Sequence, residues 1–374
     1  MLKITKSLAE ADIFEKIVIL AMTSSELPEH EVLDEKREVI SLRCTLGQGS
    51  TKTFWKALRI IEWSGRILLS LKGQKVACIN CHHLSVLPVC TAIKVLKHSK
   101  LIYDTHELET ETVASHGIRK RLSKILERLL IRFVDETIVV NDSIAQWYKH
   151  EYRLKRVWVV RNVPYNQGEN VAKTRILREA FGIRDKEIVY LFMGALSQGR
   201  GIPLLLDAFS RTHPSRHVVF MGFDHMTSLV QEYAAKYPNI HYHPAVAPSD
   251  ILKYASGADV GLCLFENTCL NHYLCLPNKV FEYMMAGLPM IVSDFPEMAA
   301  LVDHHDCGWK VAVDAEALLA LVKTIDLKEV HAKRANVCGA RCHFGWHLEE
   351  PTLLEVYRQM LGPKVGGHIP GAYR

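Results

Sequence analysis

The sequence predicts an α/β protein of two domains, each with parallel strands joined by crossover helices. Two observations predict it: strand-type and helix-type patterns alternate along the chain, and one polar, turn-rich stretch at 162–174 separates two such series. A third is length, because 374 residues are long for one domain and 48% hydrophobic residues suffice for two cores. We therefore expect domains over 1–164 and 165–346.

The expected elements follow these patterns in order. The strands of the first series are expected at 17–22, 39–42, 76–81, 101–103, 137–140 and 157–160, with helices at 53–71 and 118–133 between them. Strands of the second series are expected at 188–192, 217–221, 240–243, 260–264 and 290–292. A closing helix within 347–361 is expected to pack back toward the first domain, and 362–374 to form a flexible tail.

Several classes of protein are excluded by what the sequence lacks. No apolar run approaches the ~18 residues that span a bilayer, and the short run at 17–22 follows charged residues, unlike a signal peptide. Ten cysteines without a secretion signal indicate a reducing compartment, so we expect a cytoplasmic protein. The segment GQGSTKT at 47–53 lacks the glycine that precedes the lysine of a P-loop, and we interpret it as a flexible loop.

The most informative segment is LPNKVFEYMMAGLPMIVSDFP, residues 276–296. Pro277 and Asn278 are turn and helix-cap residues, and the helix that follows ends at Gly287. Lys279 and Glu282 project from one face of this helix, and the cation lies in the first turn, where the helix dipole disfavours it. An anion bound at that N-terminus would explain the placement, whereas the alternative is a solvated Lys–Glu pair.

This segment resembles the donor-binding signature of the family 4 glycosyltransferases, retaining enzymes of the GT-B fold, in its LPNK/FEY subgroup. A second block, YLFMGALSQGRGIPLLLDAF at 190–209, resembles the first strand and loop of that family's nucleotide domain. The resemblance covers residues 1 to about 360. It implies two Rossmann-like domains whose parallel sheets face each other across a cleft.

The resemblance also implies roles for particular residues. Arg200 and Lys279 are expected to stabilise the departing β-phosphate, because Arg forms forked hydrogen bonds and Lys supplies a point charge. Glu282 is expected to accept from the ribose hydroxyls. His106 is expected to touch the transferred sugar or the acceptor hydroxyl, and Glu107 to orient it or to assist deprotonation.

The remaining expected contacts to the donor are polar or glycine residues. The resemblance places Gly194, Gly201, Gly222 and Asn278 near the nucleotide. Where the family has a further glutamate this chain has Leu274, and two neighbouring polar residues, Asn271 and Tyr273, are candidates to replace its hydrogen bonds. Asp104, in the DTHE segment, is interpreted as a turn and capping residue, and His82 as either a cleft residue or a packed histidine.

We expect neither a metal nor a cofactor other than the donor substrate. The sequence lacks the Asp-x-Asp pair of metal-dependent glycosyltransferases. A short cluster of Cys338, Cys342, His343 and His347 has no second ligand pair, and we interpret it as packing residues.

Charge is uneven and bears on the partners. Residues 1–164 carry 26 Lys and Arg against 19 Asp and Glu, and much of the excess lies in the amphipathic stretch 117–133. Such a helix either packs on the domain or lies on an anionic membrane, so a place at the inner face of the cytoplasmic membrane stays open. No nucleic-acid partner is expected.

The leading functional hypothesis is therefore transfer of a sugar from a UDP- or GDP-sugar to a glycan or lipid-linked acceptor, with retention of configuration, in surface polysaccharide synthesis. The alternatives are a catalytically degenerate nucleotide-sugar-binding subunit and, less favoured, a UDP-sugar 2-epimerase. The chain resembles the family from its first helix and second strand onward, so we expect that the usual first strand is missing.

Overall fold

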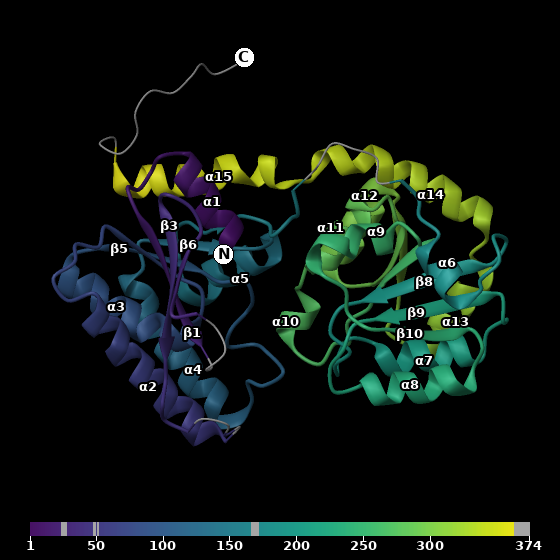
Figure 1. Cartoon of the computed structure of the whole chain (residues 1–374), viewed down its shortest axis with the longest axis horizontal. Coiled ribbons are helices and arrows are strands. Elements are labelled where there is room, and N and C mark those ends of the chain that lie inside the picture. Colours follow the sequence, from purple (N-terminus) through teal and green to yellow (C-terminus); the bar gives the residue numbers. More distant parts are fainter. Residues whose placement is uncertain (24–27, 48–49, 51, 166–171, 363–374) are drawn as a thin grey trace, which may run out of the picture.

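The computed structural model describes residues 1–23, 28–47, 50, 52–165 and 172–362. Two α/β halves lie side by side, and a long C-terminal helix runs along the top of the first half (Figure 1). The expected tail at 362–374 lies almost wholly outside the described residues, as do parts of the linker at 162–174 and of the loop at 47–53. The fold class predicted from the sequence is confirmed.

The first half contains two small sheets. One has the order β1-β3-β2 and the other the order β4-β5-β6-β7. The strands are β1 (Ile17–Thr23), β2 (His30–Val32), β3 (Arg37–Arg43), β4 (Cys78–Cys81), β5 (Lys100–Asp104), β6 (Glu136–Val139) and β7 (Trp158–Val159). The helices are α1 (Leu2–Glu10), α2 (Thr53–Ser70), α3 (Leu87–Lys97), α4 (Gly117–Leu130) and α5 (Asp142–Tyr152), with 3₁₀ turns η1 (Leu84–Val86) and η2 (Ile131–Phe133).

The second half is built on one six-stranded parallel sheet of order β10-β9-β8-β11-β12-β13. Its strands are β8 (Ile188–Met193), β9 (Arg216–Met221), β10 (Ile240–His243), β11 (Val260–Cys263), β12 (Met290–Ser293) and β13 (Gly308–Val311). The helices are α6 (Ile176–Phe181), α7 (Ile202–Ser210), α8 (Thr227–Lys236), α9 (Ile251–Ala255), α10 (Leu270–Tyr273), α11 (Asn278–Met285), α12 (Pro296–His305), α13 (Ala315–Thr324) and α14 (Leu327–Ala340). Two 3₁₀ turns, η3 (Pro248–Asp250) and η4 (Arg341–His343), complete it.

The central strands of this sheet are apolar throughout because helices cover both of their faces. Every residue of β8 is buried, and the residues of β8 alternate between two core clusters, one on each side of the sheet. From β8 the chain proceeds outward to β9 and β10, then returns to β11 on the other side of β8. This reversal of strand order opens a crevice at the carboxyl ends of the strands, where ligands bind in open α/β sheets.

The last helix, α15 (Trp346–Leu361), joins the two halves. It follows α14 of the second half, yet Trp346, Leu353 and Tyr357 pack with Ile4 and Leu8 of α1 in one buried cluster. The indole N–H of Trp346 donates to Ser7 Oγ at 2.7 Å.

One strand of the first half differs from the expected arrangement of parallel strands joined by crossover helices. The short strand β2 pairs antiparallel with β3, because only a tight turn separates them. In β4, Cys78 and Cys81 pack in clusters on opposite faces of the sheet. In the second half, β13 was missed because its four residues include an exposed lysine, Lys310, and a glycine, Gly308.

Candidate active site

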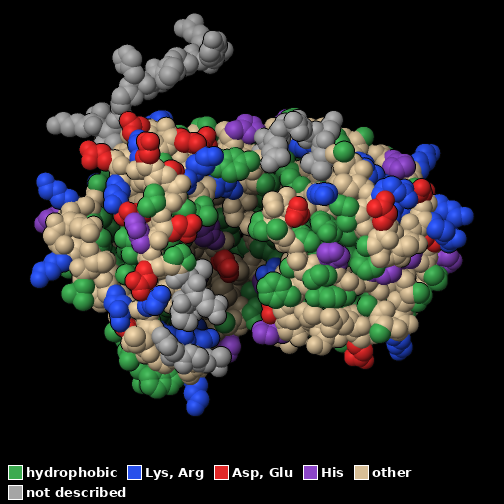
Figure 2. Space-filling view, in the orientation of Figure 1, with side chains coloured by type: hydrophobic (Ala, Val, Ile, Leu, Met, Phe, Trp, Pro, Cys, Tyr) green, Lys and Arg blue, Asp and Glu red, His purple; other side chains and the backbone are tan. Residues whose placement is uncertain are grey.

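A cavity of about 770 Å³ lies between the two halves. The surface is hollowed there, with charged side chains on both walls (Figure 2). The second half contributes the loops after β8, β9, β10 and β11 and the start of α11; the first half contributes the loop after β5. The predicted site residues that line it are His106, Glu107, Gly194, Arg200, Gly222, Asn271, Asn278, Lys279 and Glu282.

Lys279 is the most unusual of these residues. It is 8% exposed, and its ammonium is buried without a hydrogen-bond partner among the described residues. The Nζ atom lies 4.1 Å from the centre of the Phe192 ring. Burial lowers the pKa of Lys279 from 10.5 to about 8. A buried cation without a carboxylate partner is costly unless a ligand anion completes the site.

Arg200 lies close to Lys279, as the sequence predicted. Its guanidinium stacks 5.1 Å from the centre of the Phe265 ring, and Lys279 Nζ is 6.0 Å from the same ring. Arg200 Nε donates to Ser197 Oγ at 3.2 Å. Among the described residues neither cation forms an ion pair, so two positive charges without a paired carboxylate line the cavity.

The helix α11 begins at this wall. Pro277 occupies the N-cap and Asn278 is already the first helical residue, so the expected cap by Asn278 is wrong: no side chain of a described residue caps this end. Backbone N–H groups at an uncapped N-terminus favour an anion. Glu282, one turn on, lines the same cavity, and burial raises the pKa of its carboxyl against the opposing effect of Lys279.

Two glycines let the loops after β8 and β9 meet under the cavity. A Cβ atom on Gly222 would lie 1.9 Å from the carbonyl oxygen of Gly194, so no other residue fits without moving the backbone. Gly194 has φ +115°, and a Cβ there would be 3.7 Å from Lys279 Nζ. Gly194 therefore brings backbone close to the ammonium, and Gly222 packs directly against Gly194.

The opposite wall comes from the first half. His106 is exposed and Glu107 lines the cavity beside it. Asn271 of α10 crosses the gap: its Nδ2 donates to Glu107 Oε2 at 3.1 Å, and its Oδ1 accepts from the Leu108 N–H at 2.8 Å. Asn271 thus links the walls, rather than presenting a free amide.

Three predicted positions have other surroundings. Gly201 does not line the cavity; it starts α7 with φ +68°, and its N–H donates to Glu266 Oε1 at 3.3 Å. Tyr273 also lies outside the lining and packs against Phe295. Leu274 packs against the core of the first half, and its carbonyl accepts from Asn141 Nδ2 at 2.8 Å.

Sequence reasoning missed several residues of the lining. His272 is half-buried there, and burial lowers its pKa. Further missed residues include Asn162, Phe223, Asp224, Phe265 and Cys275. His272 could have been found from the sequence, because it lies in the segment LNHYLCLPNK between the two predicted residues Asn271 and Tyr273.

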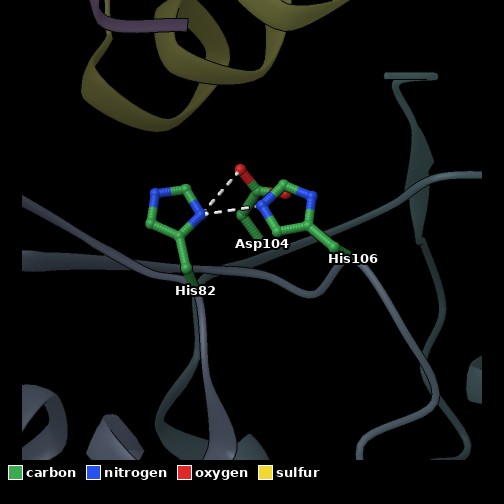
Figure 3. A group of neighbouring side chains, drawn as sticks. All are labelled: His82, Asp104 and His106. Carbon is green, nitrogen blue, oxygen red and sulfur yellow. Dashed lines mark hydrogen bonds and ion pairs between the residues drawn. The ribbon is translucent and has the colours of Figure 1, made fainter. Parts of the chain in front are cut away.

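His106 belongs to a group of three side chains, with His82 and Asp104, that meet at the carboxyl ends of β4 and β5 (Figure 3). His82 Nδ1 lies 3.3 Å from Asp104 Oδ2 and 3.2 Å from His106 Nε2. Asp104 is 2% exposed and ends β5, so its expected role as a turn and capping residue is wrong. Burial lowers the pKa of His82, partly opposed by Asp104. His82 does not line the cavity.

The expected packing of the Cys338–His347 cluster is also wrong. Cys338, Cys342, His343 and His347 are exposed on α14 and the turn and helix that follow it. Within the described ranges, the one group of side chains close enough to share an ion is His82, Asp104 and His106.

Comparison with known families identifies the class of the second half. Residues 187–325 match the model of a family described as glycosyl transferases group 1. This range runs from β8 to α13 and supplies most of the cavity wall. Over this range the second half is therefore similar to the glycosyl transferases of group 1.

Solved structures show the same fold over nearly the whole chain. Sucrose-phosphate synthase from Thermosynechococcus elongatus matches with a TM-score of 0.76 and 16% identity, over 96% of this chain and 91% of that one. The HepE protein of Anabaena, in complex with UDP and glucose, matches with a TM-score of 0.66 and 15% identity, over 86% of each chain. These are GT-B proteins, so the chain has the GT-B fold.

A curated relative extends the similarity in sequence. Chitobiosyldiphosphodolichol beta-mannosyltransferase of Eremothecium gossypii is 23% identical over 382 residues, which cover 89% of this chain and 79% of the relative.

Proposed function

We propose that this protein transfers a sugar from a nucleotide diphosphate sugar to a glycan or lipid-linked acceptor. The observation that carries the proposal is the ammonium of Lys279, buried in the cavity wall without a partner among the described residues. Arg200 and the N-terminus of α11 lie at the same wall. Two cations and a helix N-terminus form a site for a pyrophosphate.

The same wall supplies what departure of the nucleotide requires. When the bond between sugar and β-phosphate breaks, negative charge grows on the phosphate, and pre-placed cations stabilise it. Arg200 and Lys279 take this role, so the step needs no metal ion at the pyrophosphate. Glu282, in the same lining, is the acceptor for the ribose hydroxyls.

The acceptor side is the wall of the first half. His106 and Glu107 face the cavity opposite the cations, and a glycan hydroxyl entering there would lie between them and the donor sugar. The relative's name specifies a mannosyl group and a lipid-linked glycan, and HepE binds UDP and glucose. These support a UDP- or GDP-hexose as donor and a lipid-linked acceptor, as in assembly of a surface polysaccharide.

Retention of configuration is part of the proposal, since the sequence resembles retaining enzymes. Nuclear magnetic resonance of the anomeric proton in a freshly formed product should show the configuration of the donor. An inverted product would instead make Glu107 or His106 the base that activates the acceptor hydroxyl.

The decisive experiment removes the buried charge. Lys279→Met keeps the stem of the side chain and should lower turnover by about 10²–10³-fold, as loss of one charge-stabilising group does. Calorimetry with UDP and GDP should show the matching loss of affinity. Lys328→Met, at an exposed lysine of α14, is the matched control and should behave as wild type. Near-normal turnover in both Lys279→Met and Arg200→Ala would overturn the proposal.

We also propose that the first half rests on an anionic membrane through α4, which suits a lipid-linked acceptor. Its apolar residues are exposed: Ile118 by 76%, Leu122 by 61% and Leu129 by 52%. Basic residues of the same helix, such as Arg119 and Arg121, are exposed beside them. Hydrophobic side chains gather at the lower end of this half (Figure 2). An amphipathic helix with this composition binds the interface of anionic bilayers. No helix among the described residues is long and apolar enough to cross a membrane.

Vesicle binding tests the membrane contact. Cosedimentation with vesicles containing phosphatidylglycerol should be strong at low salt and weak with phosphatidylcholine alone. Leu122→Ser should weaken binding about tenfold, because each buried leucine contributes about 1.5–3 kcal/mol. Leu348→Ser, at a leucine of α15 that is 46% exposed, should not change it. Equal binding by the two variants would contradict this contact.

A further inference from the structure

We infer that His82, Asp104 and His106 form a binding site for a first-row divalent transition metal ion of the Zn²⁺ type. The site lies in the first half, at the carboxyl ends of β4 and β5, away from the cations that hold the nucleotide. It is independent of the proposed pyrophosphate site, and Figure 3 shows its three side chains converging.

The first argument is that one hydrogen atom cannot serve both contacts of His82. Its Nδ1 lies 3.3 Å from Asp104 Oδ2 and 3.2 Å from His106 Nε2. If Nδ1 carries a hydrogen, it can donate to only one of the two neighbours. If Nδ1 accepts from His106 instead, its lone pair faces a carboxylate oxygen. In either arrangement one close contact lacks a hydrogen, whereas a cation would satisfy all three lone pairs.

The second argument is an unsatisfied buried oxygen. Asp104 is 2% exposed, and its Oδ2 has no hydrogen-bond partner among the described residues. The amino group of Met1 interacts with Asp104 electrostatically. It does not supply the missing hydrogen bond to Oδ2. Buried carboxylate oxygens are normally paired or bound to a metal.

The third argument is the spacing. Ligand bonds of about 2.0–2.1 Å in a tetrahedron place neighbouring ligand atoms about 3.3 Å apart. The two separations at His82, 3.3 Å to Asp104 and 3.2 Å to His106, match this edge. All three ligand atoms lie within 4.8 Å of one another, so one ion can be shared among them after a small turn of the side chains.

The ligand types indicate the class of ion. Two imidazoles and one carboxylate suit Zn²⁺, Fe²⁺ or Co²⁺, whereas Mg²⁺ and Ca²⁺ prefer oxygen ligands alone. Three protein ligands leave at least one position open. Because His106 lines the cavity, that position is available to water or to a substrate oxygen.

A metal titration tests the inference. The full-length protein is stripped with a chelator, dialysed and titrated with Co²⁺, whose visible absorption reports nitrogen and oxygen ligation, and then with Zn²⁺ by calorimetry. Wild type should bind one ion per chain. His82→Ala and His106→Ala should each weaken binding by more than about 100-fold, beyond what loss of an outer partner costs.

The neighbouring histidine provides the control. The side chain of His83 is 69% exposed and its Nδ1 contacts Glu109 Oε1 at 2.8 Å, so His83→Ala should bind as wild type does. Because His106 is exposed, its replacement by alanine leaves no buried cavity, and His106→Ala should fold. This variant therefore tests the site even if His82→Ala does not fold. Absence of binding by wild type, or equal binding by His106→Ala and His83→Ala, would overturn the site. The UDP affinity of His82→Ala, whose side chain lies outside the cavity lining, should equal that of wild type.

Discussion

At the scale of single residues, Lys279 illustrates how the site uses an unfavourable placement. Burying an ammonium without a carboxylate costs stability, and the pKa of about 8 expresses that cost. The aromatic faces of Phe192 and Phe265 offset part of it through cation–π contact. The remainder is recovered when an anion binds, so the cost of folding becomes affinity for a phosphate.

This placement predicts a particular dependence on pH. Between pH 8 and 10.5 the unfolded chain holds the proton of Lys279 and the folded protein does not, so the free energy of unfolding should rise with pH through that window. Affinity for UDP should change in the opposite direction, falling about tenfold per pH unit above the pKa, because phosphate binds the ammonium form. Calorimetric titrations from about pH 7 to 9 measure it.

The matched variant for this test is Lys279→Arg, whose guanidinium keeps its charge throughout. Its affinity for UDP should stay level across the same range, whatever its absolute value. A decline equal to that of wild type would show that another group titrates.

At the scale of elements, α4 has the predicted amphipathic pattern but an unexpected orientation. Its apolar residues are exposed, and the one residue of the helix that is fully buried is Glu127. Its carboxylate accepts from the hydroxyls of Tyr103 at 2.9 Å, Tyr148 at 2.8 Å and Tyr152 at 2.5 Å. A buried carboxylate with three donors anchors the helix on its polar side, and leaves the apolar side for a partner.

Removing this anchor should be costly. Glu127→Leu leaves three tyrosine hydroxyls without their acceptor, and each unsatisfied group costs about 1–3 kcal/mol, so the free energy of unfolding should fall by at least about 3 kcal/mol. Urea unfolding followed by circular dichroism measures the change. The control is Glu151→Leu on α5, which removes an ion pair with Arg128 of α4. Because this pair is partly exposed, its loss should lower the free energy of unfolding by about 1 kcal/mol or less. Similar losses in the two variants would contradict the anchor.

At the scale of the whole molecule, several contacts hold the halves around the cavity. Along the top, α15 packs on α1. Across the gap, α10 of the second half reaches the first, where Leu270 and Leu274 join its core and Asn271 bonds to Glu107 and Leu108. The cavity width therefore depends on the short helix α10.

Weakening this bridge should open the molecule. Asn271→Ala removes two hydrogen bonds between the halves, each contributing about 0.5–1.5 kcal/mol, and should shift the balance toward open forms roughly tenfold. Small-angle scattering without nucleotide should then give a larger radius of gyration than wild type. Asn336→Ala, whose amide bonds only to Asp306 within the second half, is the control and should leave it unchanged. An unaltered radius for Asn271→Ala would show that the two hydrogen bonds of Asn271 do not set the spacing.

The sequence by itself determined the alternation of strands and helices, the position of α11, and the two cations that line the cavity. These are local signals: apolar runs define buried strands, and a lysine in the first turn of a helix, where the helix dipole disfavours a cation, indicates a bound anion. Only the tertiary structure decided that Glu127 lies inside, that Asn271 links the walls, and that His82 meets Asp104 and His106. Those residues come from separate helices, strands and loops, and short-range patterns do not record which of these elements meet in the fold.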